Sequence, residues 1–165
     1  VNMVSYVNVG SAWGVAAGNP KNFDPSDPCG ATIAVQTGTA QEKYAATLSN
    51  ECVAAGKNKI TVMPHELQTD IATKLIGGQY DATLADSTVI GYTSAQSAGK
   101  IEQLGDTFES APQGVAVAKD DAQLAEAVQK AMQYLMDNGY LKDILASYGA
   151  ENAALTTATL NPSVD

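Results

Sequence analysis

The chain has 165 residues, of which 45% are hydrophobic and 16% are charged, and this composition predicts a folded globular domain rather than a disordered chain. The formal net charge of -9 argues against a nucleic-acid partner, because such partners require a basic surface. The sequence has no apolar run approaching the ~18 residues that a membrane-spanning helix needs.

The two cysteines, Cys29 and Cys52, do not form a CxxC motif, and His65 is the single histidine. Such a set does not supply a four-ligand zinc site without carboxylates, so we expect no metal site and no cofactor. A disulfide fits the pair better, although two unrelated buried thiols remain the alternative. If the disulfide forms, it indicates an oxidising compartment.

Short apolar or alternating runs between Gly- and Pro-rich turns predict strands. The run Thr-Ile-Ala-Val-Gln at 32–36 is nearly continuous in apolar residues, as in a buried parallel strand. Pro64 bounds a later strand and places His65 in a loop. The predicted strands, in chain order, cover residues 11–17, 32–36, 60–63, 80–84, 101–104 and 114–118.

Helical spacing of apolar residues and capping residues predict the segments between these strands to be helices. The first helix covers about 40–54, and a short one capped by Thr69 ends at the glycines 77–78. A third, capped by Ser87, covers 89–96. The longest begins near Asp120 and Asp121, and a final helix carries Leu141, Ile144 and Leu145. The apolar stripe of the longest helix comprises Leu124, Ala127, Val128, Ala131, Leu135 and Met136.

This alternation predicts an α/β fold, a doubly wound and mostly parallel sheet with helices on both faces. Ligands of such sheets bind at the carboxyl ends of the strands, where helices begin. Two sequence segments stand at such points: Gly38 to Gln41, after the strand 32–36, and Asp86, after the strand 80–84.

The four residues from Thr39 to Glu42 match the capping-box pattern, in which Thr39 accepts from the Glu42 amide and Glu42 reaches back. This is a common structural motif. The other first-turn amides, at Ala40 and Gln41, still point outward and can bind a carboxylate, and Gly38 lets the backbone approach a ligand. On its own the pattern indicates anion binding only weakly.

Asp86 could equally be a helix N-cap, a solvated surface charge or a partner for a ligand ammonium group. Gln68, just before a capped helix, could reach the side chain of a ligand. A helix N-terminus together with a carboxylate would suit a zwitterion.

Four segments, in order, carry a family resemblance. Residues 34–42 (AVQTGTAQE) resemble the V-x-x-G-T-T-x-E segment of bacterial amino-acid-binding proteins of ABC importers, of the periplasmic binding protein-like type II class. Residues 78–87 resemble their G-R-x-D-A-x-x-x-D segment, and residues 111–121 resemble P-Y-G-I-A-V-x-K-x-D. Residues 137–162 resemble their terminal segment, which ends in N-P.

The resemblance implies a two-lobed protein that closes on an amino acid by hinge motion. It assigns the ligand α-carboxylate to Thr39 and to the Ala40 and Gln41 amides, and the α-ammonium group to Asp86. Ala40 replaces the second Thr of the family motif, which removes one hydroxyl donor. Gln113 replaces a hinge-side Tyr of the family, which removes the aromatic ring at that position.

The resemblance also implies a division of the chain. We expect residues 1–8 to be a hinge-proximal segment, 9–113 the second, ligand-binding lobe, and 114–165 a C-terminal segment that normally returns to the first lobe. Most of the first lobe would then be missing.

The expected function is therefore that of the substrate-binding component of an ABC importer for a polar amino acid, not an enzyme. Its partners would be the amino acid and the importer's membrane subunits, outside the cytoplasm, either periplasmic or anchored at the cell surface. The C-terminal helices could also mediate self-association. The alternatives are a dehydratase- or lyase-type enzyme on the same scaffold, and a sensor or structural module without ligand binding.

Overall fold

The computed structural model describes residues 1–163; Val164 and Asp165, the end of the expected C-terminal segment, lie outside the described residues. The chain forms two compact units, one covering Ser11–Phe108 and the other combining Val1–Gly10 with the chain from Glu109 onward. Two long strands, β1 and β5, each contribute to both units.

The sheet has five strands in the order β3-β2-β4-β1-β5. Three strands on one side of the sheet are parallel, because β2 pairs in parallel with both β3 and β4, whereas β1 runs antiparallel to β4. This arrangement confirms the predicted α/β fold with a mostly parallel sheet. The strands are β1 (Asn2–Ala16), β2 (Thr32–Gln36), β3 (Thr61–His65), β4 (Ala82–Asp86) and β5 (Ile101–Val117).

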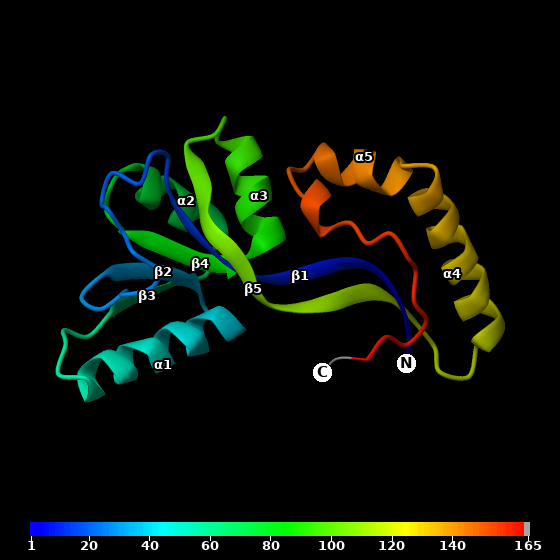
Figure 1. Cartoon of the computed structure of the whole chain (residues 1–165), viewed down its shortest axis with the longest axis horizontal. Coiled ribbons are helices and arrows are strands. Elements are labelled where there is room, and N and C mark those ends of the chain that lie inside the picture. Colours follow the sequence, from blue (N-terminus) through cyan, green and yellow to red (C-terminus); the bar gives the residue numbers. More distant parts are fainter. Residues whose placement is uncertain (164–165) are drawn as a thin grey trace. The chain divides into compact units, whose positions relative to one another are not determined.

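Helices cover both faces of the sheet in the unit Ser11–Phe108, as Figure 1 shows. The alternation of side chains along β2 assigns the faces: Ile33 and Val35 share a buried cluster with α1, whereas Ala34 packs with α2. Ala85 of β4 packs with α3 on the same side as α2. The three helices are α1 (Ala40–Ala54), α2 (Gln68–Ile76) and α3 (Ser87–Gln96).

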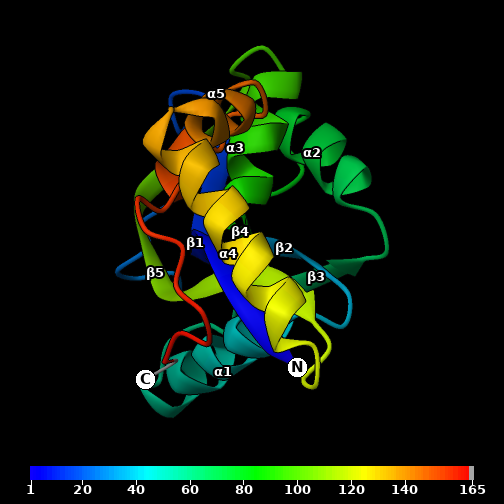
Figure 2. The same cartoon turned by 90° about the vertical axis from the view of Figure 1, so that its right-hand side faces the viewer.

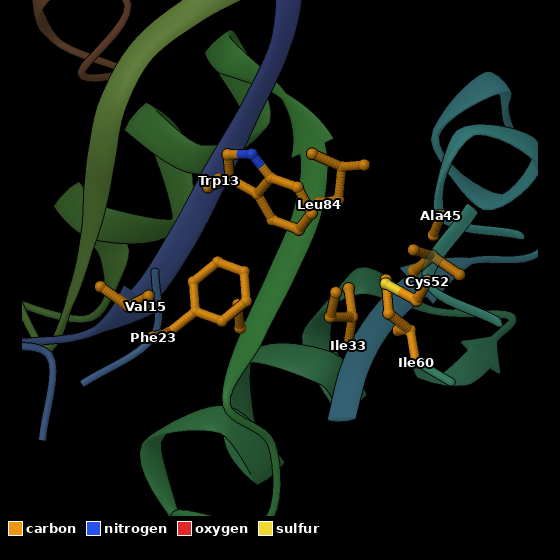
Figure 3. Close-up of a cluster of buried hydrophobic side chains, with 10 residues drawn as sticks. Trp13, Val15, Phe23, Ile33, Ala45, Cys52, Ile60 and Leu84 are labelled. Atoms are coloured by element: carbon orange, nitrogen blue, oxygen red, sulfur yellow. The ribbon is translucent and has the colours of Figure 1, made fainter. Parts of the chain in front are cut away.

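The largest buried cluster lies between the sheet and α1, and Figure 3 shows its side chains. Trp13 and Phe23 pack with ring centroids 5.1 Å apart, and Trp13 is only 5% exposed. Ala45 and Cys52 bring α1 against the same cluster. This apolar contact fixes the position of α1 and thereby of its N-terminal turn on the sheet.

Several predicted boundaries differ from the structure. The strand expected to stop at Pro64 continues through it to His65, because β3 is an edge strand, where a missing amide donor is tolerated. Helix α2 begins at Gln68 with Leu67 at the N-cap position, so Thr69 lies in its first turn and is not the cap.

The long strands were predicted only in part. β1 begins at Asn2 instead of residue 11. The two short strands expected at 101–104 and 114–118 are one strand, β5, in which Gly105 and Glu109 have positive φ angles of 75° and 50°. The Gly and Pro residues of this segment therefore interrupt the sequence pattern without ending the strand.

In the other unit the C-terminal helices follow the prediction closely. Asp121 caps α4 (Ala122–Asp137), its side chain accepting from the Leu124 amide. Gly139, with a φ of 76°, separates α4 from α5 (Tyr140–Ala146), and a short 3-10 helix, η1 (Glu151–Ala153), follows.

The segment after η1 is an ordered return segment. Gln133 and Gln129 of α4 donate to carbonyls of this segment, and Val4 of β1 bridges to Leu160 within the same unit. Figures 1 and 2 show this segment beside α4. Within residues 1–163, no helix combines the length and the apolar character that crossing a membrane requires.

The predicted disulfide is present: Cys29 and Cys52 are bonded, with their Cα atoms 5.6 Å apart. It ties the segment before β2 to the last turn of α1. Reduction, or replacement of both cysteines by serine, should lower the free energy of unfolding by about 3 kcal/mol. The reason is that the bond closes the loop between residues 29 and 52 in the unfolded chain and so lowers its conformational entropy.

Urea unfolding with and without reductant measures this loss, and the Cys29→Ser/Cys52→Ser variant serves as the control because reductant should not change its stability. Mass spectrometry after alkylation checks the bond directly. Two thiols that react with the alkylating agent in the unreduced, unfolded protein would show that the prediction is wrong.

Candidate functional site

The three parallel strands end at one edge of the sheet, and a helix follows each of them. In the ladder Gln36 of β2 lies beside His65 of β3, and Val35 lies beside Leu84 of β4. The turns that follow therefore bring Thr39, Gln68 and Asp86 to the same edge.

A cavity of about 50 Å³ lies at this edge. Four of the six predicted ligand-binding residues line it, all within the unit Ser11–Phe108. Gly38 and Ala40 are neighbours of these residues in the chain but do not belong to the lining. The lining residues are Gln36, Thr39, Gln41, Gln68, Leu84, Ala85, Asp86 and Val89.

The turn before α1 has the predicted capping box. Thr39 Oγ1 accepts from the Glu42 amide at 3.2 Å, and Glu42 Oε2 accepts from the Gly38 amide at 2.7 Å. The left-handed φ of 80° at Gly38 makes this turn possible. Because Glu42 occupies the Gly38 amide, the groups of this turn that suit an anion are the amides at the start of α1, which have no partner inside the helix.

The Thr39 hydroxyl is committed to the local structure. It donates to the Gln36 carbonyl at 2.7 Å while it accepts from Glu42. A hydroxyl that already donates its single hydrogen cannot donate to a ligand in the same rotamer. In this conformation the Thr39 hydroxyl has no hydrogen left to donate, and only the backbone of Thr39 could contact an anion.

Asp86 occupies the N-cap position of α3, but its side chain makes no capping hydrogen bond. Its Oδ1 atom instead accepts from Gln41 Nε2 at 2.7 Å. The interpretation of Asp86 as a side-chain cap is therefore wrong for this structure. The carboxylate is held beside the cavity by a neighbour from another helix.

Gln41 is the polar side chain that links the elements of the site. It is 8% exposed, and Nε2 also donates to Ser11 Oγ at 3.1 Å. Ser11 lies opposite Asp86 in the antiparallel β1–β4 ladder. One amide group thus connects α1, β1 and β4, and both of its hydrogens are used.

Sequence reasoning missed Ser11, Gln36 and Val89 as members of this region. Ser11 comes next to Asp86 only because β1 inserts beside β4, a pairing between residues distant in the chain that a single sequence does not reveal. Gln36 could have been found, because it is the last residue of the strand that precedes the capping box.

Comparison with known proteins was made at three levels. No family model matches the chain. The chain is 35% identical over 161 residues to the arginine-binding protein ArgT of Corynebacterium glutamicum, and the match covers 97% of this chain and 53% of that protein. The chain thus spans about half the length of this curated relative.

Solved structures show the same fold. A substrate-binding protein of a polar amino acid ABC uptake transporter from Streptococcus thermophilus matches 94% of this chain and 59% of its own, with a TM-score of 0.72 and 17% identity. Substrate-binding domain 2 of Lactococcus lactis GlnP, in its open conformation, matches 90% of this chain and 61% of its own, with a TM-score of 0.69 and 21% identity. The resemblance predicted from the four motifs is therefore confirmed.

Replacement of Gln41 by leucine should lower the free energy of unfolding by about 1–3 kcal/mol, because it leaves two buried or half-buried oxygens without their donor. The matched control is Gln36→Leu, since Gln36 is exposed and donates only to the exposed carbonyl of Glu66. That change should stay within about 0.5 kcal/mol. Urea unfolding of both variants measures the difference, and equal losses would contradict the role assigned to Gln41.

Proposed function

We propose that this chain, as a relative of amino-acid-binding proteins of ABC transporters, carries the ligand-binding lobe of a solute-binding protein for a polar amino acid. The observation that carries the proposal is the meeting of the α1 N-terminus and Asp86 at one cavity. A free amino acid carries a carboxylate and an ammonium group on one carbon atom, so its binding site needs both features close together.

The proposed roles follow from the charges. The first-turn amides at Ala40 and Gln41, with the positive end of the α1 dipole, bind the α-carboxylate. Asp86 binds the α-ammonium group through a charge-assisted hydrogen bond. Gln41 occupies Asp86 Oδ1, which directs Oδ2 to the ligand.

L-arginine is the first ligand to test, because the relative that is 35% identical over 161 residues is described as arginine-binding. The Ala40 position supplies an amide but no hydroxyl. The carboxylate would therefore be bound mainly by backbone groups of this lobe, and closure of the site by a second lobe would supply the rest.

A binding role is favoured over the enzyme alternative by the state of the titratable side chains near the strand ends. Asp86 is bonded to Gln41, Glu42 is bonded to the Gly38 amide, and His65 Nε2 lies 2.6 Å from Tyr80 Oη. These hydrogen bonds join each group to a structural neighbour and not to one another, so they do not form the linked nucleophile and base that covalent catalysis uses.

The proposed location is outside the cytoplasm, where the Cys29–Cys52 disulfide would persist. The proposed partners are the amino acid and the membrane subunits of an importer. Hinge motion would use β1 and β5, because the chain passes between its two units only through these strands, at residues 10–11 and 108–109.

The binding prediction is tested in a hybrid, in which this chain replaces the matching part of the Corynebacterium glutamicum protein. Asp86→Asn in the hybrid should weaken binding of L-arginine by about 2–5 kcal/mol, because it removes the charge partner of the ammonium group. The fold should persist, since asparagine can still accept from Gln41. Isothermal titration calorimetry measures the change.

Asp70→Asn is the control, because Asp70 is an exposed acidic residue in the first turn of α2. Equal affinity of the Asp86 variant and its parent would make Asp86 a structural residue only. A folded hybrid that binds no amino acid of a full panel would favour the module without ligand binding. A ligand recovered in altered form would favour the enzyme.

We further propose that the 165-residue chain associates with itself through α4 and α5. No residue of the apolar stripe predicted on α4 is buried, and its Leu124 is 49% exposed. Tyr134 of α4, outside that stripe, is 60% exposed, and Ile144 of α5 is 55% exposed. Apolar surface of this kind marks an association site. The chain alone should then bind amino acids only weakly, since it presents one side of the cleft.

Light scattering across a concentration series should show dimers that the double variant Leu124→Glu/Ile144→Lys disperses. Val53→Lys is the matched control, because Val53 on α1 is 57% exposed but lies in the other unit. A parent chain that stays monomeric at all concentrations, or dispersal by the control alone, would contradict the proposal.

A further inference from the structure

A second and larger cavity adjoins the proposed amino-acid site. It has a volume of about 570 Å³ and lies between α2 and α3. Gln68, at the first position of α2, and Val89, in the first turn of α3, line both this groove and the small cavity that contains Asp86. The two cavities therefore meet at these two side chains, where the two helices begin.

The Gln68 side chain presents an unsatisfied acceptor at this junction. Its Oε1 atom is buried, and no donor for it exists within residues 1–163. A buried amide oxygen without a hydrogen-bond donor costs free energy, so native structures rarely leave one unpaired. A ligand group that carries an N–H would satisfy it.

Two hydroxyl groups along the groove also present acceptors. Thr73 Oγ1 donates to the Thr69 carbonyl, and Thr93 Oγ1 donates to the Val89 carbonyl. Because each hydroxyl hydrogen is used inside its own helix, these oxygens offer only their lone pairs to the groove.

No residue of the lining carries a formal charge, and Ala72 and Val89 contribute apolar surface. This surface would cover the methylene groups of a side chain while acceptors face the polar end. A ligand carboxylate would meet these acceptors with no cation in the lining to compensate for its desolvation.

We propose that the α2–α3 groove is the subsite for the side chain of the bound amino acid, and that it selects long side chains ending in N–H donors, such as a carboxamide or a guanidinium group. Gln68 Oε1 accepts one N–H at the mouth of the groove. This inference rests on the proposed binding of an amino acid between α1 and Asp86.

The test uses NMR titration of the 15N-labelled 165-residue chain, which detects millimolar binding and locates it. The four ligands are L-glutamine, L-arginine, L-glutamate and L-norleucine. Glutamine and glutamate have almost the same shape, but only the side chain of glutamine carries N–H donors. We expect glutamine and arginine to shift the Gln68 side-chain amide and the Thr73 and Thr93 amides, and glutamine to bind about tenfold more tightly than glutamate.

The variant Gln68→Met keeps the size and helical preference of the side chain but removes the acceptor. It should weaken glutamine binding about tenfold and leave norleucine binding unchanged. Gln123→Met is the matched control, since Gln123 is an exposed residue near the start of α4 that lines neither cavity and should have little effect.

The outcomes separate this inference from the proposed function. If all four ligands shift Thr39 and Asp86 with equal affinity and Gln68→Met changes nothing, the groove is not the side-chain subsite, while the amino-acid site stands. If no ligand shifts any resonance up to its solubility limit, the proposed function fails for this chain and the subsite fails with it.

Discussion

The parallel pairing of β2 with both β3 and β4 is the constraint on which the site depends. Parallel neighbours run in one direction, so their carboxyl ends, and the helices that follow them, meet at one edge of the sheet. The buried residues Ile33, Val35 and Leu84 hold these strands in register through the core against α1. A shift in that register would separate Thr39 from Asp86, whatever their local structure.

The side chain of Gln41 fixes the orientation of Asp86 at this edge of the sheet. An isolated carboxylate at a strand end can adopt several rotamers, cap the next helix or turn to solvent. Here the side-chain amide of Gln41 donates to Oδ1 of Asp86 and to Ser11 Oγ. These two hydrogen bonds link α1, β4 and β1 and fix the orientation of the Asp86 carboxylate. Buried hydrogen bonds of this kind are strong because the surroundings screen them poorly. In the proposed site, the ammonium group of a ligand would then meet a carboxylate that is already oriented.

Much of this organisation is encoded locally and could be read from the sequence. The limits of β2 and α1 follow from an apolar run, a capping box and a terminal glycine, and the capping box forms as expected. The proposed site residues come from motifs that lie beside one another in the chain.

The remainder depends on contacts between distant segments. The role of the Gln41 side chain requires β1 to lie beside β4, and the length of β5 overrides the Gly and Pro residues within it. The α2–α3 groove is lined by residues of ordinary helical character. Only the packing of the two helices shows that the hydroxyl groups of Thr73 and Thr93 present acceptors to it.

Pro64 has a consequence for the solubility of the protein. It lies in β3, the outermost strand on its side of the sheet, beside Val35 of β2. An exposed strand edge is a template onto which a strand of another molecule can add, the first step of edge-to-edge aggregation. Proline has no amide hydrogen, so it interrupts the row of donors that such an incoming strand would need. Pro64, at which the sequence predicted the strand to end, thus hinders the addition of another strand at the β3 edge of the sheet.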